Sequence, residues 1–243
     1  MLNCAPRSLP ALKTILIPSQ FTFNQMKQRA LSVASRDYGG RGRLIQRCSE
    51  CRLSSSLCLC EQIHAKPSSV DFLLLFHRDE IFKPTNTGKL IDDCFPDHTF
   101  CFEWSRTEPQ PELLQLLNDP KRRFYILYPY DLEQPRELVN AIPVAENDQK
   151  IPTLVILDGT WRQSRRMFNS SRWLPNFPIF KLTPEQASTY ATRGAAYQNY
   201  LSTAESVALA LSESGLMESG THLQNLYAEF NHRYQQMKEN RRS

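Results

Sequence analysis

Four consecutive residues in the middle of the chain carry side chains suited to acid–base chemistry and to ring stacking. Asp158, Gly159, Thr160 and Trp161 follow an apolar run at 154–157 and precede an arginine-rich stretch. A carboxylate can move a proton, and an indole can stack on an aromatic ligand. Because ligand sites in α/β proteins lie at the carboxyl ends of strands, these residues form a candidate active site. The structural alternative is that Asp158 or Thr160 caps the next helix and Trp161 fills the core.

A second cluster is formed by Cys48, Cys51, Cys58 and Cys60. Two close pairs of thiolates joined by a tight loop suit a tetrahedral zinc ion, and four sulfur ligands leave no open position for a substrate. We therefore predict a structural zinc site in a reducing compartment, where disulfides are rare. The alternative is a set of unrelated buried thiols, which is how we interpret Cys94 and Cys101.

Four further groups of residues follow predicted strands or precede predicted helices. A Thr/Asn/Gly-rich loop before a helix can bind an anion or cap the helix, and Ser202 with Glu205 fits a capping box. A proline after a strand turns the chain into a loop. These groups are His77 and Glu80; Thr85, Asn86, Thr87 and Gly88; Leu127, Tyr128 and Pro129; and Leu201, Ser202, Thr203 and Glu205.

The elements that position these residues alternate between strands and helices, which predicts an α/β domain with a largely parallel sheet. Short apolar runs predict strands with both faces covered, at 70–76, 100–104, 124–128, 153–157 and 179–182. Helices are predicted at 24–37, 88–94, 111–117, 135–141, 162–169, 202–212 and 223–237, with Gly215 and Gly220 separating the last two.

Composition indicates a globular chain of 243 residues with one large core. No apolar stretch approaches the roughly 18 residues of a membrane span, and three early prolines argue against a secretory signal, so we expect a cytoplasmic location without membrane contact. The net charge of +4 is modest, but its arginines gather near the candidate sites and favour a polyanionic partner. They are Arg36, Arg41, Arg43, Arg47 and Arg52 near the cysteines, and Arg162, Arg165, Arg166 and Arg172 after the Asp158 cluster.

The predicted organisation has four parts. Residues 1–44 form a leader, poorly ordered to about residue 25, and a basic helix; residues 45–66 form the Cys4 zinc module. Residues 67–235 form the main domain, and residues 236–243 form a charged tail.

Five motifs occur in an order that resembles the DTW-domain family, the tRNA-uridine aminocarboxypropyltransferases: the four cysteines, His77 and Glu80 with Thr85 to Gly88, Leu127 to Pro129, Asp158 to Trp161, and Leu201 to Glu205. The resemblance covers about residues 45–230, and its signature is the Asp-Gly-Thr-Trp tetrapeptide at 158–161. It implies a SPOUT-like domain with a C-terminal trefoil knot that binds S-adenosyl-L-methionine as co-substrate. It also implies transfer of the 3-amino-3-carboxypropyl group to the imide nitrogen of a tRNA uridine, which forms acp3U.

The resemblance implies the following site. Asp158, Thr160 and Trp161 are the catalytic candidates, with Asp158 the best base because burial beside Trp161 would raise its pKa. Leu127, Tyr128, Pro129, Asp158, Gly159, Leu201, Ser202, Thr203 and Glu205 are assigned to the co-substrate. The substrate set comprises His77, Glu80, Thr85, Asn86, Thr87, Gly88, Arg162, Arg165 and Arg193. Trp161 is expected to stack on adenine or on an extruded uracil, and the loop 85–88 or Arg193 to hold the donor's carboxylate. The arginines between 36 and 52, presented by the zinc module, are expected to bind tRNA.

Two other functions remain open at this point. A SPOUT-type RNA methyltransferase would use the same donor, and a zinc-dependent RNA-binding protein without catalysis would need only the cysteines and arginines. Whether the chain is a monomer or a homodimer does not follow from the sequence.

Overall fold

A computed structural model of the chain describes residues 16–33, 45–128, 136–143, 149–182 and 201–240. Within these residues six parallel strands form one sheet, in the order β2-β1-β5-β3-β6-β4. The strands are β1 (Asp71–Phe76), β2 (Thr99–Glu103), β3 (Arg122–Leu127), β4 (Leu138–Val139), β5 (Ile151–Asp158) and β6 (Ile179–Phe180). The predicted α/β class with a parallel sheet is therefore confirmed.

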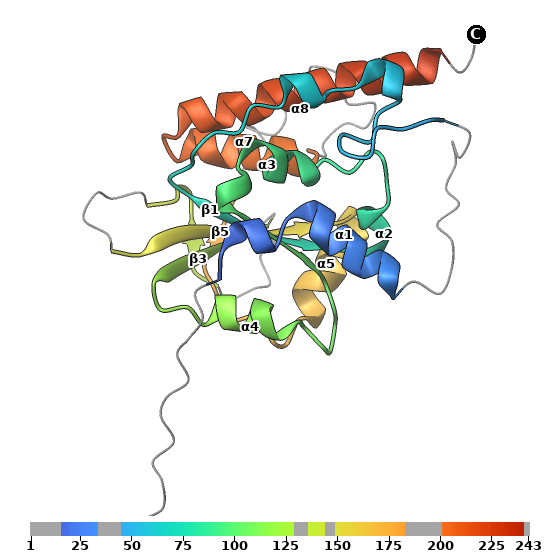
Figure 1. The fold of residues 1–243 in the computed structure, drawn as a ribbon. Coiled ribbons are helices and arrows are strands. Elements are labelled where there is room, and N and C mark those ends of the chain that lie inside the picture. Colours follow the sequence, from blue (N-terminus) through green and yellow to red (C-terminus); the bar gives the residue numbers. More distant parts are fainter. Residues whose placement is uncertain (1–15, 34–44, 129–135, 144–148, 183–200, 241–243) are drawn as a thin grey trace, which may run out of the picture.

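Helices cover both faces of this sheet, as the continuous apolar strands predicted (Figure 1). The α-helices are α1 (Phe23–Ser32), α2 (Arg78–Ile81), α3 (Lys89–Cys94), α4 (Pro111–Leu117), α5 (Trp161–Ser170), α7 (Thr203–Glu213) and α8 (Met217–Glu239). Short 3-10 helices lie at Pro18–Gln20, Ser55–Leu57, Cys60–Gln62 and Pro96–His98.

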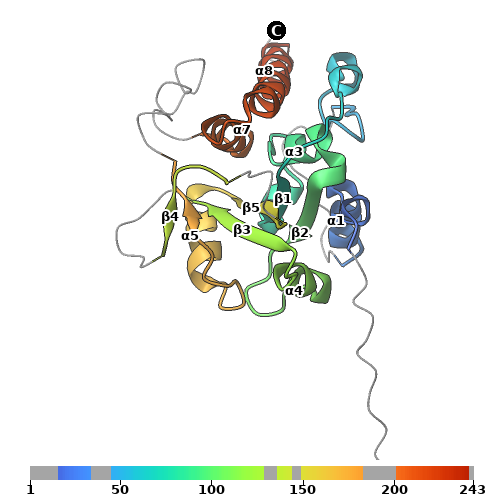
Figure 2. The same ribbon diagram turned by 90° about the vertical axis from the view of Figure 1, so that its left-hand side faces the viewer.

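Alternate residues along each central strand contribute to two separate hydrophobic cores. Phe72, Leu74 and Phe76 of β1 pack with α3, α7 and α8, whereas Leu73 and Leu75 pack with α4 and α5. Figure 2 shows the pair α7–α8 on one side of the sheet and α4 and α5 on the other. The two cores bury both faces of the sheet. Polar residues lie at its carboxyl edge.

The segment 135–141 is not the helix that its leucine and alanine content suggested. Its described part, from residue 136, contains the edge strand β4, which pairs with β6. The amide of Ile179 donates to the carbonyl of Glu137 (2.8 Å), and that of Lys181 donates to Val139 (3.0 Å). Pairing with a strand distant in the sequence outweighs a weak local helix preference.

Two further expectations need correction. Residues 16–25 are not a loose leader, because Phe21 and Phe23 are buried and the amide of Cys101 donates to the carbonyl of Phe21 (2.6 Å). Gly220 does not separate the last two helices but lies inside α8, where an added Cβ would stand 2.7 Å from the carbonyl oxygen of Ala208. Gly215, with a φ of +79°, does end α7 as predicted.

Parallel pairing brings the ends of β1 and β5 to the same edge. Phe76 lies opposite Asp158, and the amide of His77 donates to the Asp158 carbonyl (2.9 Å). The segment 183–200 connects β6 to α7 outside the described residues, so the predicted knot stays a prediction. None of the described helices is long and apolar enough to cross a membrane.

Candidate active site and metal centre

Asp158 is the point where three distant segments of the chain meet. It is the last residue of the central strand β5 and is only 3% exposed. Its Oδ1 accepts a hydrogen bond from the hydroxyl of Thr203 (2.6 Å), and its Oδ2 accepts one from the side-chain amide of Asn86. The carboxylate therefore ties the end of β5 to the loop before α3 and to the start of α7.

The loop Thr85–Gly88 closes on Asp158 from one side. The Oδ1 of Asn86 accepts from the amide of Lys89 (3.0 Å), so this side chain begins α3 and binds Asp158 at the same time. At Gly88 an added Cβ would lie 2.9 Å from Asp158 Oδ1 and 2.9 Å from the ring of Phe76. The close approach of Asp158 and Phe76 therefore requires glycine at this position. The predicted anion-binding or capping role did not include this reason.

The start of α7 closes on Asp158 from the other side. Ser202 and Glu205 form the predicted capping box: the Ser202 hydroxyl accepts from the Glu205 amide (3.3 Å), and the Glu205 carboxylate accepts from the Ser202 amide (2.9 Å). The amide of Ala204 donates to the hydroxyl of Thr87 (3.4 Å), which joins the two loops directly. The first turn of α7 is thus locked against the loop 85–88.

The pKa of Asp158 is raised to about 6, chiefly because burial disfavours the charged form, with the negative charge of Glu80 adding to the effect. The hydrogen bonds from Thr203 and Asn86 act in the opposite direction. The predicted rise of the pKa and its predicted cause, burial, are confirmed, whereas a contribution of Trp161 to that burial stays a prediction. Trp161 is 42% exposed, and the contacts around the carboxylate come from Asn86, Gly88 and Thr203.

Trp161 and Thr160 occupy the start of α5. The Thr160 hydroxyl caps the helix through a capping box with Gln163, so the capping alternative holds for Thr160 and not for Asp158. The indole of Trp161 stacks on the ring of Tyr128 at a centroid distance of 5.9 Å, and Tyr128 stacks on Phe168 at 4.2 Å. Trp161 therefore does not fill the core but forms the exposed end of a column of three rings.

The residues after β1 lie beside this site. His77 caps α2, with its Nδ1 accepting from the Asp79 amide (3.3 Å), and its ring stacks on Trp104 (6.0 Å). Glu80 is buried and forms an ion pair with Lys83 (2.6 Å). His77 and Glu80 therefore both have structural partners. The sequence pattern gave no signal for these contacts.

The other predicted residues fall into three groups. Leu127 and Tyr128 are buried at the end of β3, and Gly159 and Leu201 flank the Asp158 contacts in the sequence while being partly exposed. Arg162 and Arg165 are exposed on α5. Pro129 and Arg193 lie outside the described residues.

Sequence reasoning missed Tyr227, which lies on α8 behind the capping box. Burial, followed by the negative charge of Glu205, raises the pKa of Tyr227 to about 12. Tyr227 lies more than 20 positions after the capping box, and no short sequence motif connects the two. Only the packing of α8 on α7 reveals that Tyr227 lies near this site.

The four predicted cysteines come together. Their sulfur atoms all lie within 4.8 Å of one another, with Cys48 and Cys60 separated by 3.5 Å and Cys51 and Cys58 by 3.7 Å. The amide of Leu59 donates to the sulfur of Cys51 (3.3 Å), as ordered thiolate sites require. The cluster can therefore hold a metal ion. Cys94 and Cys101 are buried thiols, as predicted.

The two described arginines of the basic group predicted around the cysteines differ in exposure, because Arg52 is buried and Arg47 is partly exposed. Arg52 is 8% exposed and donates to the carbonyl of Ile81 (2.9 Å), and Arg47 donates to the carbonyl of Arg52 (3.0 Å). Arg52 therefore has an internal role, and a role of Arg47 in binding tRNA stays a prediction. Arg36, Arg41 and Arg43 lie outside the described residues.

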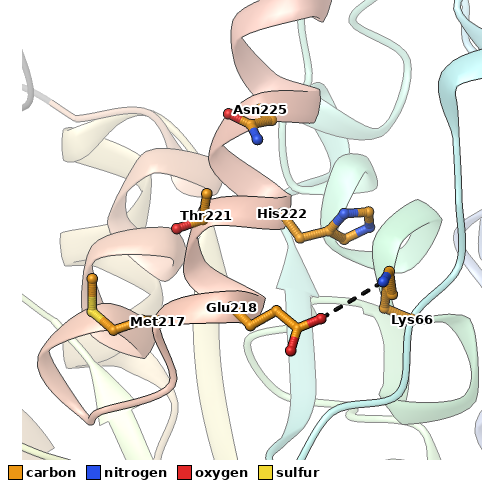
Figure 3. A pocket seen from close by; sticks show the side chains of 6 residues that line it. All are labelled: Lys66, Met217, Glu218, Thr221, His222 and Asn225. Atoms are coloured by element: carbon orange, nitrogen blue, oxygen red, sulfur yellow. Dashed lines mark ion pairs between the residues drawn. The ribbon is translucent and has the colours of Figure 1, made fainter.

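A separate cavity of about 440 Å³ lies at the first turns of α8 (Figure 3). It is lined by Lys66, Met217, Glu218, Thr221, His222 and Asn225, and Lys66 pairs with Glu218 across 3.6 Å. None of the predicted site residues lines it, so the meeting point at Asp158 remains the candidate active site.

The parallel α/β fold, the junction at Asp158 and the four-cysteine cluster define an α/β protein with a cysteine site that could hold a metal ion. The DTW domain model matches residues 45–237, and the chain belongs to this family. It is 28% identical over 183 residues to the tRNA-uridine aminocarboxypropyltransferase 2 of Macaca fascicularis. The match covers 73% of this chain and 58% of the length of that relative. No solved structure matches the chain significantly.

Proposed function

We propose that the chain transfers the 3-amino-3-carboxypropyl group of S-adenosyl-L-methionine to the imide nitrogen of a tRNA uridine. The observation that carries the proposal is the junction of Asp158, Asn86 and Thr203 at the carboxyl edge of the sheet. This junction lies in a DTW-family chain that is similar to a protein named tRNA-uridine aminocarboxypropyltransferase 2. Ligands of parallel α/β proteins bind at this edge.

The reaction balances as a single displacement. The uridine imide nitrogen forms a bond to the donor's methylene carbon, and the bond from that carbon to the sulfonium sulfur breaks. The electron pair stays on sulfur, so neutral methylthioadenosine leaves, and the imide proton passes to a base. The chain must therefore orient the donor's side chain towards the uridine and accept or release one proton.

We assign the proton to Asp158. With a pKa of about 6 the carboxylate is ionised at neutral pH and has nearly the basicity that suits proton transfer there. Each of its oxygens accepts one described hydrogen bond and retains a second lone pair, which is where the imide proton would bind. Asn86 and Thr203 then orient the carboxylate rather than take part in the transfer.

The donor is assigned to the space bounded by the end of β3, the end of β5 and the start of α7. Its boundary residues are Leu127, Tyr128, Gly159, Leu201, Ser202, Thr203 and Glu205, with Pro129 following β3. The loop 85–88 meets α7 through Thr87, which supports a role for this loop in holding the donor's carboxylate, and Arg193 is the second candidate. A SPOUT-like knot would bring residues 183–200 to the same edge.

We assign the tRNA to the exposed face of α5. Trp161, Arg162, Arg165 and Arg166 are all exposed there, and α5 contains no acidic residue. Among the described carboxylates, none pairs with Arg162 or Arg166. A stacked indole beside the exposed guanidinium groups of Arg162 and Arg166 suits an extruded base and its phosphates, so Trp161 is assigned to uracil rather than to adenine.

Zinc is the metal that we propose for the cysteine cluster. Bonds near 2.3 Å in a tetrahedron place sulfurs about 3.8 Å apart, which the observed separations of 3.5 and 3.7 Å fit. Four thiolates would complete the ion's coordination, so its contribution is to the structure of the module and not to the transfer.

The co-product of a reaction with tRNA and S-adenosyl-L-methionine tests the proposal. Methylthioadenosine, formed in amounts equal to modified uridine, is the expected result. S-adenosylhomocysteine would instead identify a methyltransferase, and failure of the chain to bind the donor by calorimetry would leave a metal-containing RNA-binding protein.

A further inference from the structure

Arg52 lies between the cysteine cluster and the candidate active site. It directly follows the ligand Cys51 and has a φ of +67°, a left-handed conformation that is uncommon for residues other than glycine. Its amide donates to the carbonyl of Cys48 (3.1 Å), and the amide of Cys48 donates to the carbonyl of Leu53 (2.9 Å). The ligand loop therefore fixes the backbone of Arg52.

The turn by itself does not call for arginine. Glycine adopts a positive φ without the contact between Cβ and the backbone that arginine incurs. The side chain of Arg52 is buried, and no described carboxylate pairs with it. A buried guanidinium with no counter-charge among the described residues lowers stability, so its role follows from what it contacts.

The guanidinium of Arg52 contacts the support of the active-site loop. Its Nη1 donates to the carbonyl of Ile81, the last residue of α2 (2.9 Å). From there the chain runs through successive turns, in which the Lys83 amide donates to Glu80 (3.1 Å) and the Asn86 amide donates to Lys83 (3.1 Å). Asn86 then donates to Asp158.

A second path of contacts leads to the same place. The guanidinium lies over the ring of Phe23 at 5.7 Å, and Phe23 packs edge-on against Phe76 at 5.2 Å. The ring of Phe76 in turn limits the space at Gly88. Both paths begin at Arg52 and end at the loop that meets Asp158.

We propose that the metal cluster and Arg52 position the loop 82–88, so that metal binding determines how well Asn86 is held against Asp158. Arg52 is a positioning residue and does not contact tRNA. The identity of the ligand whose binding this loop affects rests on the proposed function, whereas the coupling between cluster and loop does not.

Amide hydrogen exchange tests the coupling in the full-length protein. Arg52→Met keeps an unbranched apolar stem and the left-handed backbone position but removes the guanidinium donor, and Arg52→Lys restores a charged donor. Ser49→Ala, at an exposed position in the same ligand loop, is the matched control. Zinc content is measured for each variant, and the wild-type protein is also measured after chelation.

We expect exchange at residues 82–90 to become about tenfold faster in Arg52→Met with its zinc retained, as loss of a hydrogen bond from a charged donor implies. Chelation of the wild type should accelerate the same peptide, Arg52→Lys should recover part of the protection, and Ser49→Ala should match the wild type. Strand β3 serves as the internal reference. A purely structural role would instead leave the loop unchanged while altering the melting temperature.

The proposal is overturned if Arg52→Met keeps wild-type protection at 82–90, or if the purified chain neither contains nor takes up zinc. Weaker tRNA binding by Arg52→Met with unchanged loop exchange would also overturn it, because Arg52 would then act on RNA. If the wild type fails to bind S-adenosyl-L-methionine while the exchange results hold, the proposed function fails and the coupling stands.

Discussion

Replacing Asp158 with asparagine separates the chemical role of this residue from its structural one. The change removes the negative charge and puts an NH2 group where one oxygen now accepts a hydrogen bond from Asn86 or Thr203. If Asp158 receives the imide proton, turnover should fall by about 10²- to 10⁴-fold, the usual contribution of a general base. Binding of S-adenosyl-L-methionine should weaken by roughly tenfold or less, because one hydrogen bond in the support of the pocket is lost.

The ionisation of Asp158 predicts the direction in which the activity changes with pH. The carboxylate must be ionised to accept a proton, so kcat/KM of the wild type should rise with pH and level off above about 6. In Asp158→Asn this acidic limb should disappear. Stopped assays of tRNA modification between pH 5 and pH 8, with calorimetry of the donor, measure both quantities.

Stability provides an independent check on the same carboxyl group. Its pKa is 3.8 when unperturbed and about 6 in the folded chain, so ionisation as pH rises from about 3 to about 7 destabilises the fold by about 3 kcal/mol in all. Asp158→Asn has no such titration, so its free energy of unfolding relative to the wild type should improve by that amount across this pH range. Denaturant unfolding at pH 3 and pH 7 measures the difference.

Full activity of Asp158→Asn with normal donor binding would refute the assignment of the base. A loss of donor binding large enough to explain the whole loss of activity would refute it as well and leave Asp158 with the positioning role only.

Three further outcomes are expected. Thr203→Val removes a hydrogen bond that stabilises the ionised form of Asp158, so the acidic limb of the pH profile should move to higher pH, whereas an unmoved limb would contradict the contact. Gly88→Ala places a Cβ 2.9 Å from Asp158 Oδ1 and from Phe76, so unfolding experiments should show a loss of about 1–3 kcal/mol, and unchanged stability would mean that the loop yields easily. Arg162→Gln should weaken tRNA binding and lower the magnitude of its salt slope by about 1 while donor affinity stays constant, and an equal effect on both ligands would place Arg162 elsewhere.

The strands β1 and β3 and the helix α4 were predictable because their apolar patterns are local. β1 and β3 begin and end within two residues of the expected bounds, and α4 has the expected bounds. The edge strand β4 was not predictable, because its two residues form a strand only through hydrogen bonds to β6, more than 35 residues later.

The candidate site was predictable as a set of motifs but not as a geometry. The order of the motifs indicated which segments would meet, and parallel pairing then placed Asp158 beside His77. The contact of Asp158 with Asn86 and its closeness to Gly88 depend on how the loop 85–88 folds back over the strand.

The distribution of charge was the least reliable sequence signal. Arg52 and Arg162 look alike in the sequence, since each follows a motif residue in a basic stretch. The first is buried against Ile81 and Phe23, and the second is exposed on α5. Only the three-dimensional structure, through the burial of Arg52 and its bond to Ile81, distinguishes these two arginines.

The most direct test of the central claim is nucleoside mass spectrometry of tRNA after incubation with the purified chain and S-adenosyl-L-methionine. The donor should carry an isotope label in its aminocarboxypropyl carbons in one reaction and in its methyl carbon in another. The account predicts a modified uridine heavier by one aminocarboxypropyl group, labelled only in the first reaction. A uridine that gains a labelled methyl group, or no modified nucleoside with any tRNA tested, would contradict it.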